Sequence, residues 1–214
     1  MIESFPRPSG SLRTHVKRPL LLAVAALLAG CASQVAPPVP GESRGFPPDL
    51  RGRRVILLPV QQNFGVRGDV DAEIRFTFTD QGREVEWVFE EEVQEILARS
   101  PTMDTRTRGL PVSLFQQAEV ERVGDPLYGQ LRRMAALVQA DAILIPIEAS
   151  FEPNETIIDS LPRVRFTATI VEPRTGRVVW YGVEEGEDFP QSDPRALASA
   201  VERLAGTLFW YVAG

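Results

Sequence analysis

The stretch that decides the fold is residues 164–183, VRFTATIVEPRTGRVVWYGV. Its first half alternates apolar and polar side chains, with the apolar ones at Val164, Phe166, Ala168 and Ile170. Such alternation is typical of a half-buried strand. Residues 172–176, EPRTG, then predict a turn, and residues 177–183 return as a second apolar strand. The sequence therefore predicts an antiparallel hairpin here.

Two other short apolar runs predict buried strands. They are residues 54–60, RVILLPV, and residues 142–147, AILIPI. Uninterrupted apolar runs of this length are typical of strands that are covered on both faces. Proline lacks the N–H group that a sheet ladder needs, so Pro146 predicts that its strand lies at an edge or carries a bulge.

Two helices are predicted to begin at Asp-Pro pairs. Asp125-Pro126 and Asp193-Pro194 each place a capping aspartate before a proline at the first helical position. The first helix has an apolar face formed by Leu127, Leu131, Met134, Ala135 and Val138. The second has one formed by Leu197, Val201, Leu204, Ala205 and Leu208. Both sets have the spacing of a helix that buries one face.

The segment between residues 61 and 107 allows more than one interpretation. Residues 61–72 predict a polar loop, and the alternation in residues 74–78, IRFTF, predicts a strand. Apolar residues at helical spacing predict a helix over residues 85–97, and an alternative pairs residues 74–78 with 85–89 as a hairpin. The helical pattern continues to Leu97, which favours the helix, and residues 102–107 predict a short strand.

Together these elements predict an α/β (α+β) fold. We expect a mixed sheet of about five strands with roughly three helices packed on it, in a single domain over residues 54–214.

The amino terminus has the pattern of a secretory signal peptide. Basic residues precede an apolar run over residues 20–29, which ends in small residues. A run of about 10 residues is too short to cross a bilayer as a helix, which needs about 20. We therefore expect residues 1–30 to be removed.

The end of this leader, Leu28-Ala29-Gly30-Cys31, resembles the lipobox of bacterial lipoproteins. The resemblance implies cleavage before Cys31, lipidation of that cysteine and anchoring in the membrane by its acyl chains. Residue 32 is alanine rather than aspartate, which in this family implies the outer membrane, facing the periplasm. The alternative, a plain signal peptide with an incidental cysteine, is disfavoured because the single cysteine lies at the cleavage point.

Residues 31–53 predict a flexible tether. Proline and glycine punctuate this segment, and it has no apolar period. Such a segment extends by roughly 3.1 Å per residue where it is polyproline-like. An alternative packs its Arg51–Arg54 end on the domain.

Loss of the leader changes the chemistry that is available. The only histidine, His15, and the only lysine, Lys17, leave with it, and the remaining chain has 19 basic and 28 acidic residues, a net charge of −9. Hydrolases that need an activated serine, cysteine or threonine, zinc sites and lysine-bearing phosphate loops are therefore excluded. The acidic balance disfavours nucleic acid. We expect no metal and no cofactor.

Two groups of side chains remain as candidates. Carboxylates gather at Asp69, Asp71 and Glu73, at Glu90-Glu91-Glu92 and at residues 184–188, where we interpret them as solvated surface groups. The candidate protein-contact residues are the aromatic ones, Trp180, Tyr181, Phe209, Trp210 and Tyr211. Aromatic residues at strand or helix spacing are usually core, but an exposed one would mark a contact patch.

The order of elements resembles a small domain of envelope proteins. The residues that carry the resemblance are Val55–Val60, Ala140–Pro146, the hairpin Ile170–Trp180 and the last helix. The domain is shared by the amino-terminal domain of TolB, the curli secretion-channel lipoprotein and the lipoprotein activators of penicillin-binding proteins. The resemblance implies a non-enzymatic protein that contacts an unidentified envelope protein.

Two alternatives to that function stay open. One is a subunit of an oligomeric curli-type secretion pore, which would need two amphipathic membrane hairpins per subunit; only residues 73–89 offer anything similar. The other is a carboxylate-dependent glycan hydrolase, which uses two acidic side chains.

Overall fold

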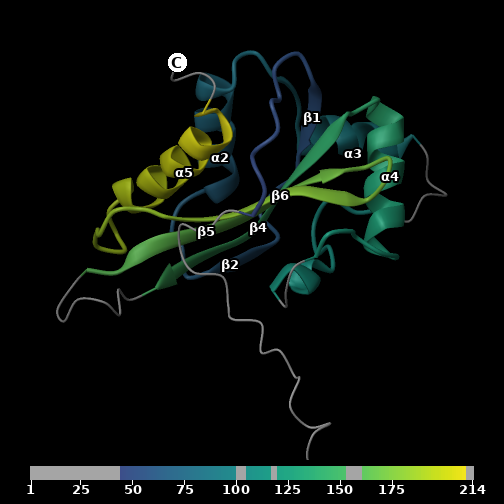
Figure 1. The fold of residues 1–214 in the computed structure, drawn as a ribbon. Coiled ribbons are helices and arrows are strands. Elements are labelled where there is room, and N and C mark those ends of the chain that lie inside the picture. Colours follow the sequence, from purple (N-terminus) through teal and green to yellow (C-terminus); the bar gives the residue numbers. More distant parts are fainter. Residues whose placement is uncertain (1–43, 100–104, 117–119, 153–160, 211–214) are drawn as a thin grey trace, which may run out of the picture. The chain divides into compact units, whose positions relative to one another are not determined.

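A mixed six-stranded sheet forms the centre of the protein in a computed structural model that describes residues 44–99, 105–116, 120–152 and 161–210 (Figure 1). The strands are β1 (Arg54–Leu57), β2 (Gln62–Phe64), β3 (Glu86–Val88), β4 (Ala142–Glu152), β5 (Arg163–Glu172) and β6 (Arg177–Glu185). The α-helices in these ranges are α2 (Val70–Gln81), α3 (Glu90–Ala98), α4 (Leu127–Val138) and α5 (Arg195–Leu208), and a 3₁₀ helix, η1, spans Val112–Gln116. The expected α/β fold with a mixed sheet in one domain is confirmed.

The strand order is β3-β1-β4-β5-β6, with β2 also paired to β4. β1 runs parallel to both β3 and β4, whereas β4, β5 and β6 are antiparallel to one another. The hairpin predicted from residues 164–183 is therefore confirmed as β5 and β6. Its turn contains Gly176, whose φ of 73° lies in the left-handed region that favours glycine.

Pro146 lies in the middle of the sheet and not at its edge. β4 pairs with β5 along one side, and the register of that pairing shifts between Pro146 and Glu148, which marks a bulge. On its other side β4 pairs first with β1 and then with β2. Of the two alternatives that the sequence left for Pro146, the structure contains the bulge.

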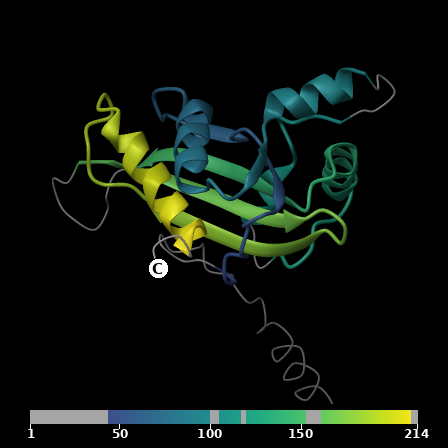
Figure 2. The same cartoon turned by 90° about the horizontal axis from the view of Figure 1, so that it is seen from above.

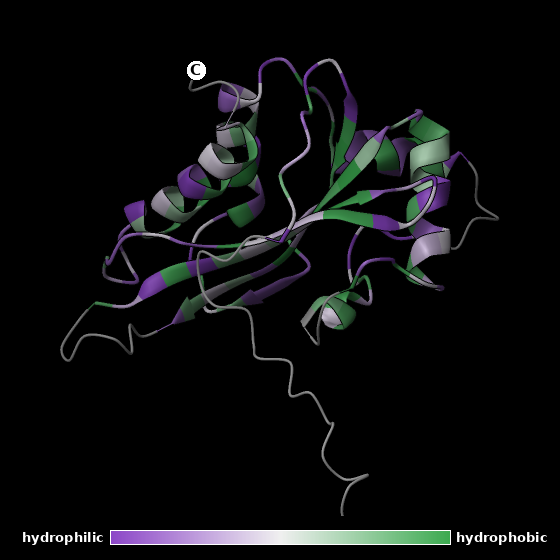
Figure 3. Cartoon of the chain, viewed as in Figure 1, coloured by the Kyte–Doolittle hydropathy of each residue, from purple (hydrophilic) through white to green (hydrophobic). Residues whose placement is uncertain are grey.

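Helices cover both faces of the sheet. α2 and α5 lie side by side on one face, and α3 and α4 lie on the other (Figures 1 and 2). The predicted apolar faces of α4 and α5 are buried. Figure 3 shows the hydrophobic colouring concentrated on the strands and on the sides of the helices that face them. The protein therefore has two cores, one on each face of the sheet.

The strand predicted over residues 74–78 is wrong, because these residues lie inside α2. Asp69 caps this helix with its side chain, which accepts a hydrogen bond from the Ala72 N–H at 3.0 Å. Ile74 and Phe78 are four residues apart and share the buried face, whereas Phe76 points to solvent. Asp69, interpreted as a solvated loop residue, therefore starts a helix.

The helix predicted over residues 85–97 is correct only in its second half. Residues 86–88 form β3, which pairs in parallel with β1, and the helix begins at Glu90. The alternative hairpin is also wrong, because its first partner is helical. Residues 105–107 form no strand, and residues 102–104 of that prediction lie outside the described residues.

The part of the expected tether that the structure describes, residues 44–53, lies against the domain. Arg44 pairs with Tyr181 of β6, donating its N–H to the Tyr181 carbonyl at 2.7 Å and accepting the Tyr181 N–H at 3.1 Å. Leu50 is buried in the core beneath α2 and α5. The packing expected as an alternative at Arg51–Arg54 therefore extends back to Arg44.

Candidate functional site

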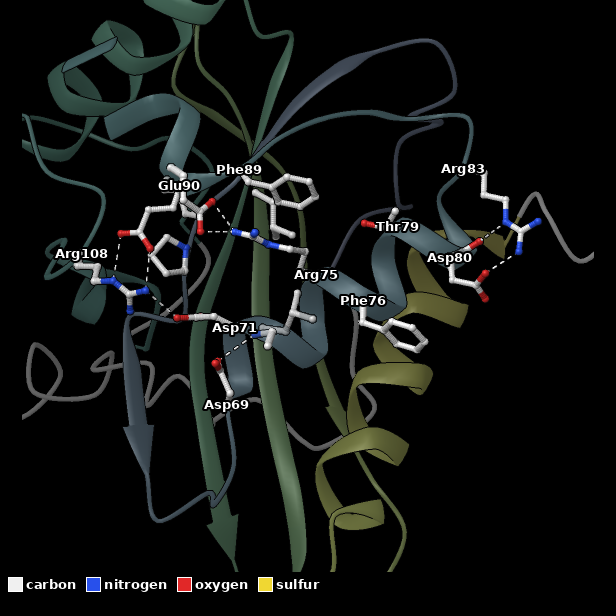
Figure 4. Close-up of a pocket in the computed structure, with 16 residues that line it drawn as sticks. Asp69, Asp71, Arg75, Phe76, Thr79, Asp80, Arg83, Phe89, Glu90 and Arg108 are labelled. Atoms are coloured by element: carbon white, nitrogen blue, oxygen red, sulfur yellow. Dashed lines mark hydrogen bonds and ion pairs between the residues drawn. The ribbon is translucent and has the colours of Figure 1, made fainter. Parts of the chain in front are cut away.

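A cleft of about 920 Å³ opens where the connections after β1 and β3 diverge (Figure 4). The chain leaves β1 for α2 on one face of the sheet, and it leaves β3 for α3 on the other face. In open α/β sheets, ligands bind in the crevice outside the carboxyl ends of strands whose connections diverge in this way. The topology therefore makes this cleft the first candidate for a binding site.

Arg108 joins the amino-terminal turns of α2 and α3 inside the cleft. Its Nη2 atom lies 2.8 Å from Asp71 Oδ2 and 2.7 Å from Glu90 Oε2. Thr107 adds a hydrogen bond from its hydroxyl to Glu90 Oε1 at 2.7 Å. Burial alone lowers the pKa of Arg108, but the hydrogen bonds to Glu90 and Asp71 outweigh it and raise that pKa above its ordinary value. The guanidinium is therefore a permanent cation that holds both helix ends.

Asp71 also fixes the chain that follows β1. Its Oδ1 atom accepts a hydrogen bond from the Val60 N–H at 2.7 Å. One carboxylate thus binds the loop after β1 with one oxygen and Arg108 with the other. This arrangement sets the distance between two walls of the cleft.

Arg75 forms a second link between α2 and α3. Its Nη2 atom donates to Glu91 Oε1 at 2.6 Å, and its guanidinium lies 4.5 Å from the centre of the Phe89 ring. The backbone N–H of Glu91 and then the hydrogen bond from Arg75 hold the pKa of the Glu91 carboxyl below its usual value. Phe76, one residue on along α2, lines the cleft and is 72% exposed.

Of the aromatic residues singled out in the sequence, the four that the structure describes are not among the residues lining this cleft, and they differ in burial. Trp180 is fully buried among α2, α5 and the sheet, while Tyr181 is buried in the core on the opposite face. Phe209 is buried beside Phe78 and Trp87. Trp180 and Tyr181 point to opposite faces of β6, and both are buried because helices cover both faces of the sheet.

Trp210 is the exposed member of the aromatic set within the described residues, at 49% exposure. It lies edge-to-face with Phe46 at a centroid distance of 6.1 Å, and Phe46 is itself 82% exposed. Tyr211 and the lipidation motif Leu28-Ala29-Gly30-Cys31 lie outside the described residues.

Sequence reasoning missed Arg75, Phe76, Phe89 and Arg108 as site residues. Asp71 and Glu90 were noticed, but as separate solvated groups 19 positions apart. The aspartate cap at residue 69, followed by acidic residues in a first helical turn, is the signal that places the first of them at a helix start. No pattern in the sequence indicates that Arg108 meets both.

The described residues lack two other kinds of feature. They contain no cluster of three or more acidic, histidine or cysteine side chains that is arranged to hold a metal ion. They also contain no helix that is both long and apolar enough to cross a membrane.

The sequence matches no protein-family model and no curated protein. Among solved structures, the chain is similar to a PelC dodecamer subunit from Paraburkholderia phytofirmans, with 13% identity, a TM-score of 0.46 and coverage of 78% of this chain and 95% of that one. It is similar to lipoprotein GNA1162 from Neisseria meningitidis, with 15% identity, a TM-score of 0.44 and coverage of 73% and 97%. It is also similar to the LpoB C-terminal domain from Escherichia coli, with 14% identity, a TM-score of 0.40 and coverage of 64% and 84%.

Proposed function

We propose that the protein is a lipid-anchored, non-enzymatic protein of the bacterial cell envelope that acts by contacting another envelope protein. Its proposed location is the outer membrane, facing the periplasm, with residues 31–43 as the tether. The lipobox at Leu28-Ala29-Gly30-Cys31 and the leader before it support the anchor. The cleft between α2 and α3 supports the contact.

The observation that carries the contact is the exposed ring of Phe76 at a cleft whose principal charged groups are already paired. Arg75 binds Glu91, and Arg108 binds Asp71 and Glu90. Phe76 and Phe89 line the same cleft, and an apolar centre with a polar rim in a concave surface is the arrangement of a protein-contact site. The paired charges fix the shape of the cleft and require no rearrangement when a partner binds.

The same geometry disfavours a glycan hydrolase. Such an enzyme needs one carboxyl with a raised pKa to act as general acid. The cleft carboxyl of Glu91 has a lowered pKa, which is the opposite of what a general acid requires.

The anchor is tested by replacing Cys31 with serine. We expect the variant to give a soluble or uncleaved product without acyl chains, because the thioether that carries them needs the sulfur atom. Intact-mass measurement of the wild-type membrane protein should show acyl groups on residue 31. An unmodified cysteine at the mature amino terminus would contradict the anchor.

The contact is tested by photocrosslinking in cells. A benzoylphenylalanine at position 76 should give a discrete adduct with one envelope protein, whereas the same group at Glu202, exposed on α5, should not. Replacing Phe76 with alanine should then weaken binding of the captured protein by about 2 kcal/mol, or roughly 30-fold. The melting temperature of the Phe76→Ala variant should hardly change, because the Phe76 ring is exposed. Adducts that are the same from both positions would refute the cleft as the contact site.

A further inference from the structure

Phe46 and Trp210 form an exposed aromatic pair that joins the two ends of the described chain. Their rings meet edge-to-face, and the Trp210 Nε1–H points to the Pro47 carbonyl at 3.4 Å. Single exposed apolar residues are ordinary on protein surfaces. Two large rings in contact, from segments more than 160 residues apart in sequence, form a defined apolar surface.

The aromatic pair stands on a rigid base. Next to Trp210, Phe209 is buried against Phe78 at a ring distance of 5.5 Å. On the other side, Leu50 is fully buried, and Arg44 is hydrogen-bonded to β6. The core residues Leu50 and Phe209 thus hold the chain close to both rings. The pair is therefore available to a surface outside the domain.

The position of the pair in the chain indicates which surface that is. Phe46 is two residues from Arg44, where the described domain begins, and only residues 32–43 separate that point from Cys31. Twelve extended residues reach about 40 Å, and a flexible chain of that length spans roughly half as much on average. The side of the domain that carries the aromatic pair is therefore held close to the lipid that the tether is attached to.

The chemistry of the pair suits that surface. Tryptophan and other aromatic residues are enriched where hydrocarbon meets lipid headgroups, since an apolar ring and a polar N–H are both satisfied there. The nearby Asp49 carboxylate is bridged by Arg51 at 2.6 Å. That hydrogen bond lowers the pKa of Asp49 to about 2, and the guanidinium offsets its negative charge. The charge of this carboxylate next to anionic headgroups is thus compensated.

We propose that the aromatic pair Phe46–Trp210 docks on the phospholipid surface that carries the chain's own lipid anchor. This inference rests on the proposed lipidation of Cys31. Docking would fix one face of the domain toward the membrane and leave the cleft between α2 and α3, on another side, for a protein.

Tryptophan quenching tests the docking directly. The lipidated, mature protein is reconstituted in phosphatidylethanolamine and phosphatidylglycerol vesicles whose acyl chains carry bromine. Trp180 is buried and Trp87 is half-buried, so we expect quenching in the wild type and its loss in a Trp210→Phe variant. An unquenched wild type overturns the docking.

A partition measurement gives an independent readout. The unlipidated Cys31→Ser protein should bind the same vesicles weakly, and adding Phe46→Ala should lower its partition coefficient about tenfold, because apolar area in the interface is lost. The matched control is Phe64→Ala, which removes an exposed ring from β2 and should leave partition unchanged. Equal effects of the two changes overturn the docking.

The remaining outcomes separate this inference from the proposed function. In one outcome, the wild-type mass shows lipidation, but Trp210 is shielded only when a second copy or another protein is present. That result assigns the aromatic pair to that occupant and overturns the docking alone. An unlipidated Cys31 in the wild type overturns the anchor and the docking together, and leaves crosslinking at Phe76 unaffected.

Discussion

Replacing Trp180 with alanine is expected to lower the free energy of unfolding by about 3–5 kcal/mol. The indole is fully buried between the sheet and the helices α2 and α5, so its loss leaves a cavity as well as lost apolar contact. Urea unfolding of the Cys31→Ser protein, followed by circular dichroism, measures the change.

The matched control for Trp180 is Trp210. Its indole is half exposed, and Trp210→Ala should cost less than about 1 kcal/mol. If the two variants lost similar stability, Trp180 would not be the core residue that the structure shows.

Gly182→Ala is expected to destabilise the protein by about 3 kcal/mol through overpacking. A Cβ atom on residue 182 would lie 2.2 Å from Cζ2 and 2.6 Å from Cη2 of the Trp180 ring, which lies over the same face of β6. The ring has no space to move because it is enclosed by the core. Thermal unfolding should therefore show a much lower melting temperature.

Two variants make this prediction specific. Gly206→Ala lies on α5, where a Cβ atom meets nothing within 4 Å, and it should raise stability by about 0.5–1 kcal/mol because alanine favours a helix. In the Trp180→Ala background, Gly182→Ala should cost far less than in the wild type, because the clashing ring is gone. An unchanged cost in that background would contradict the contact between residues 180 and 182.

The sequence predicts the hairpin, the helices α4 and α5 and the class of fold because their patterns are local. It fails at α2 because one apolar pattern fits two structures. Ile74 and Phe78 satisfy the two-residue period of a strand and also the four-residue spacing of a helix face. The two structures differ at Phe76, which would share the buried face of Ile74 and Phe78 in a strand but is exposed in the helix. Whether that ring is buried depends on the rest of the chain.

The site was less predictable than the fold. Asp71, Glu90 and Arg108 come together only because α2 and α3 begin at the same end of the sheet and the Arg108 side chain reaches both. That arrangement requires β1 and β3 to be parallel neighbours, and β3 was interpreted as the start of a helix. The sequence also could not predict which aromatic residues are buried, because their burial depends on how many faces of the sheet the helices cover.

The pairing of Arg44 with Tyr181 also determines how a mechanical load would enter the domain. If Cys31 is fixed in a membrane and a bound partner pulls on the domain, tension in the tether meets this two-hydrogen-bond contact first. The contact lies at the edge of the sheet. Beyond it the chain is held at the surface by the Phe46–Trp210 contact, and then by Leu50, which is embedded in the core. Residues 44–49 would therefore detach and lengthen the tether before the load reached Leu50 and the core. Because this weak contact breaks first, the added tether length relieves the tension before the core of the anchored protein unfolds.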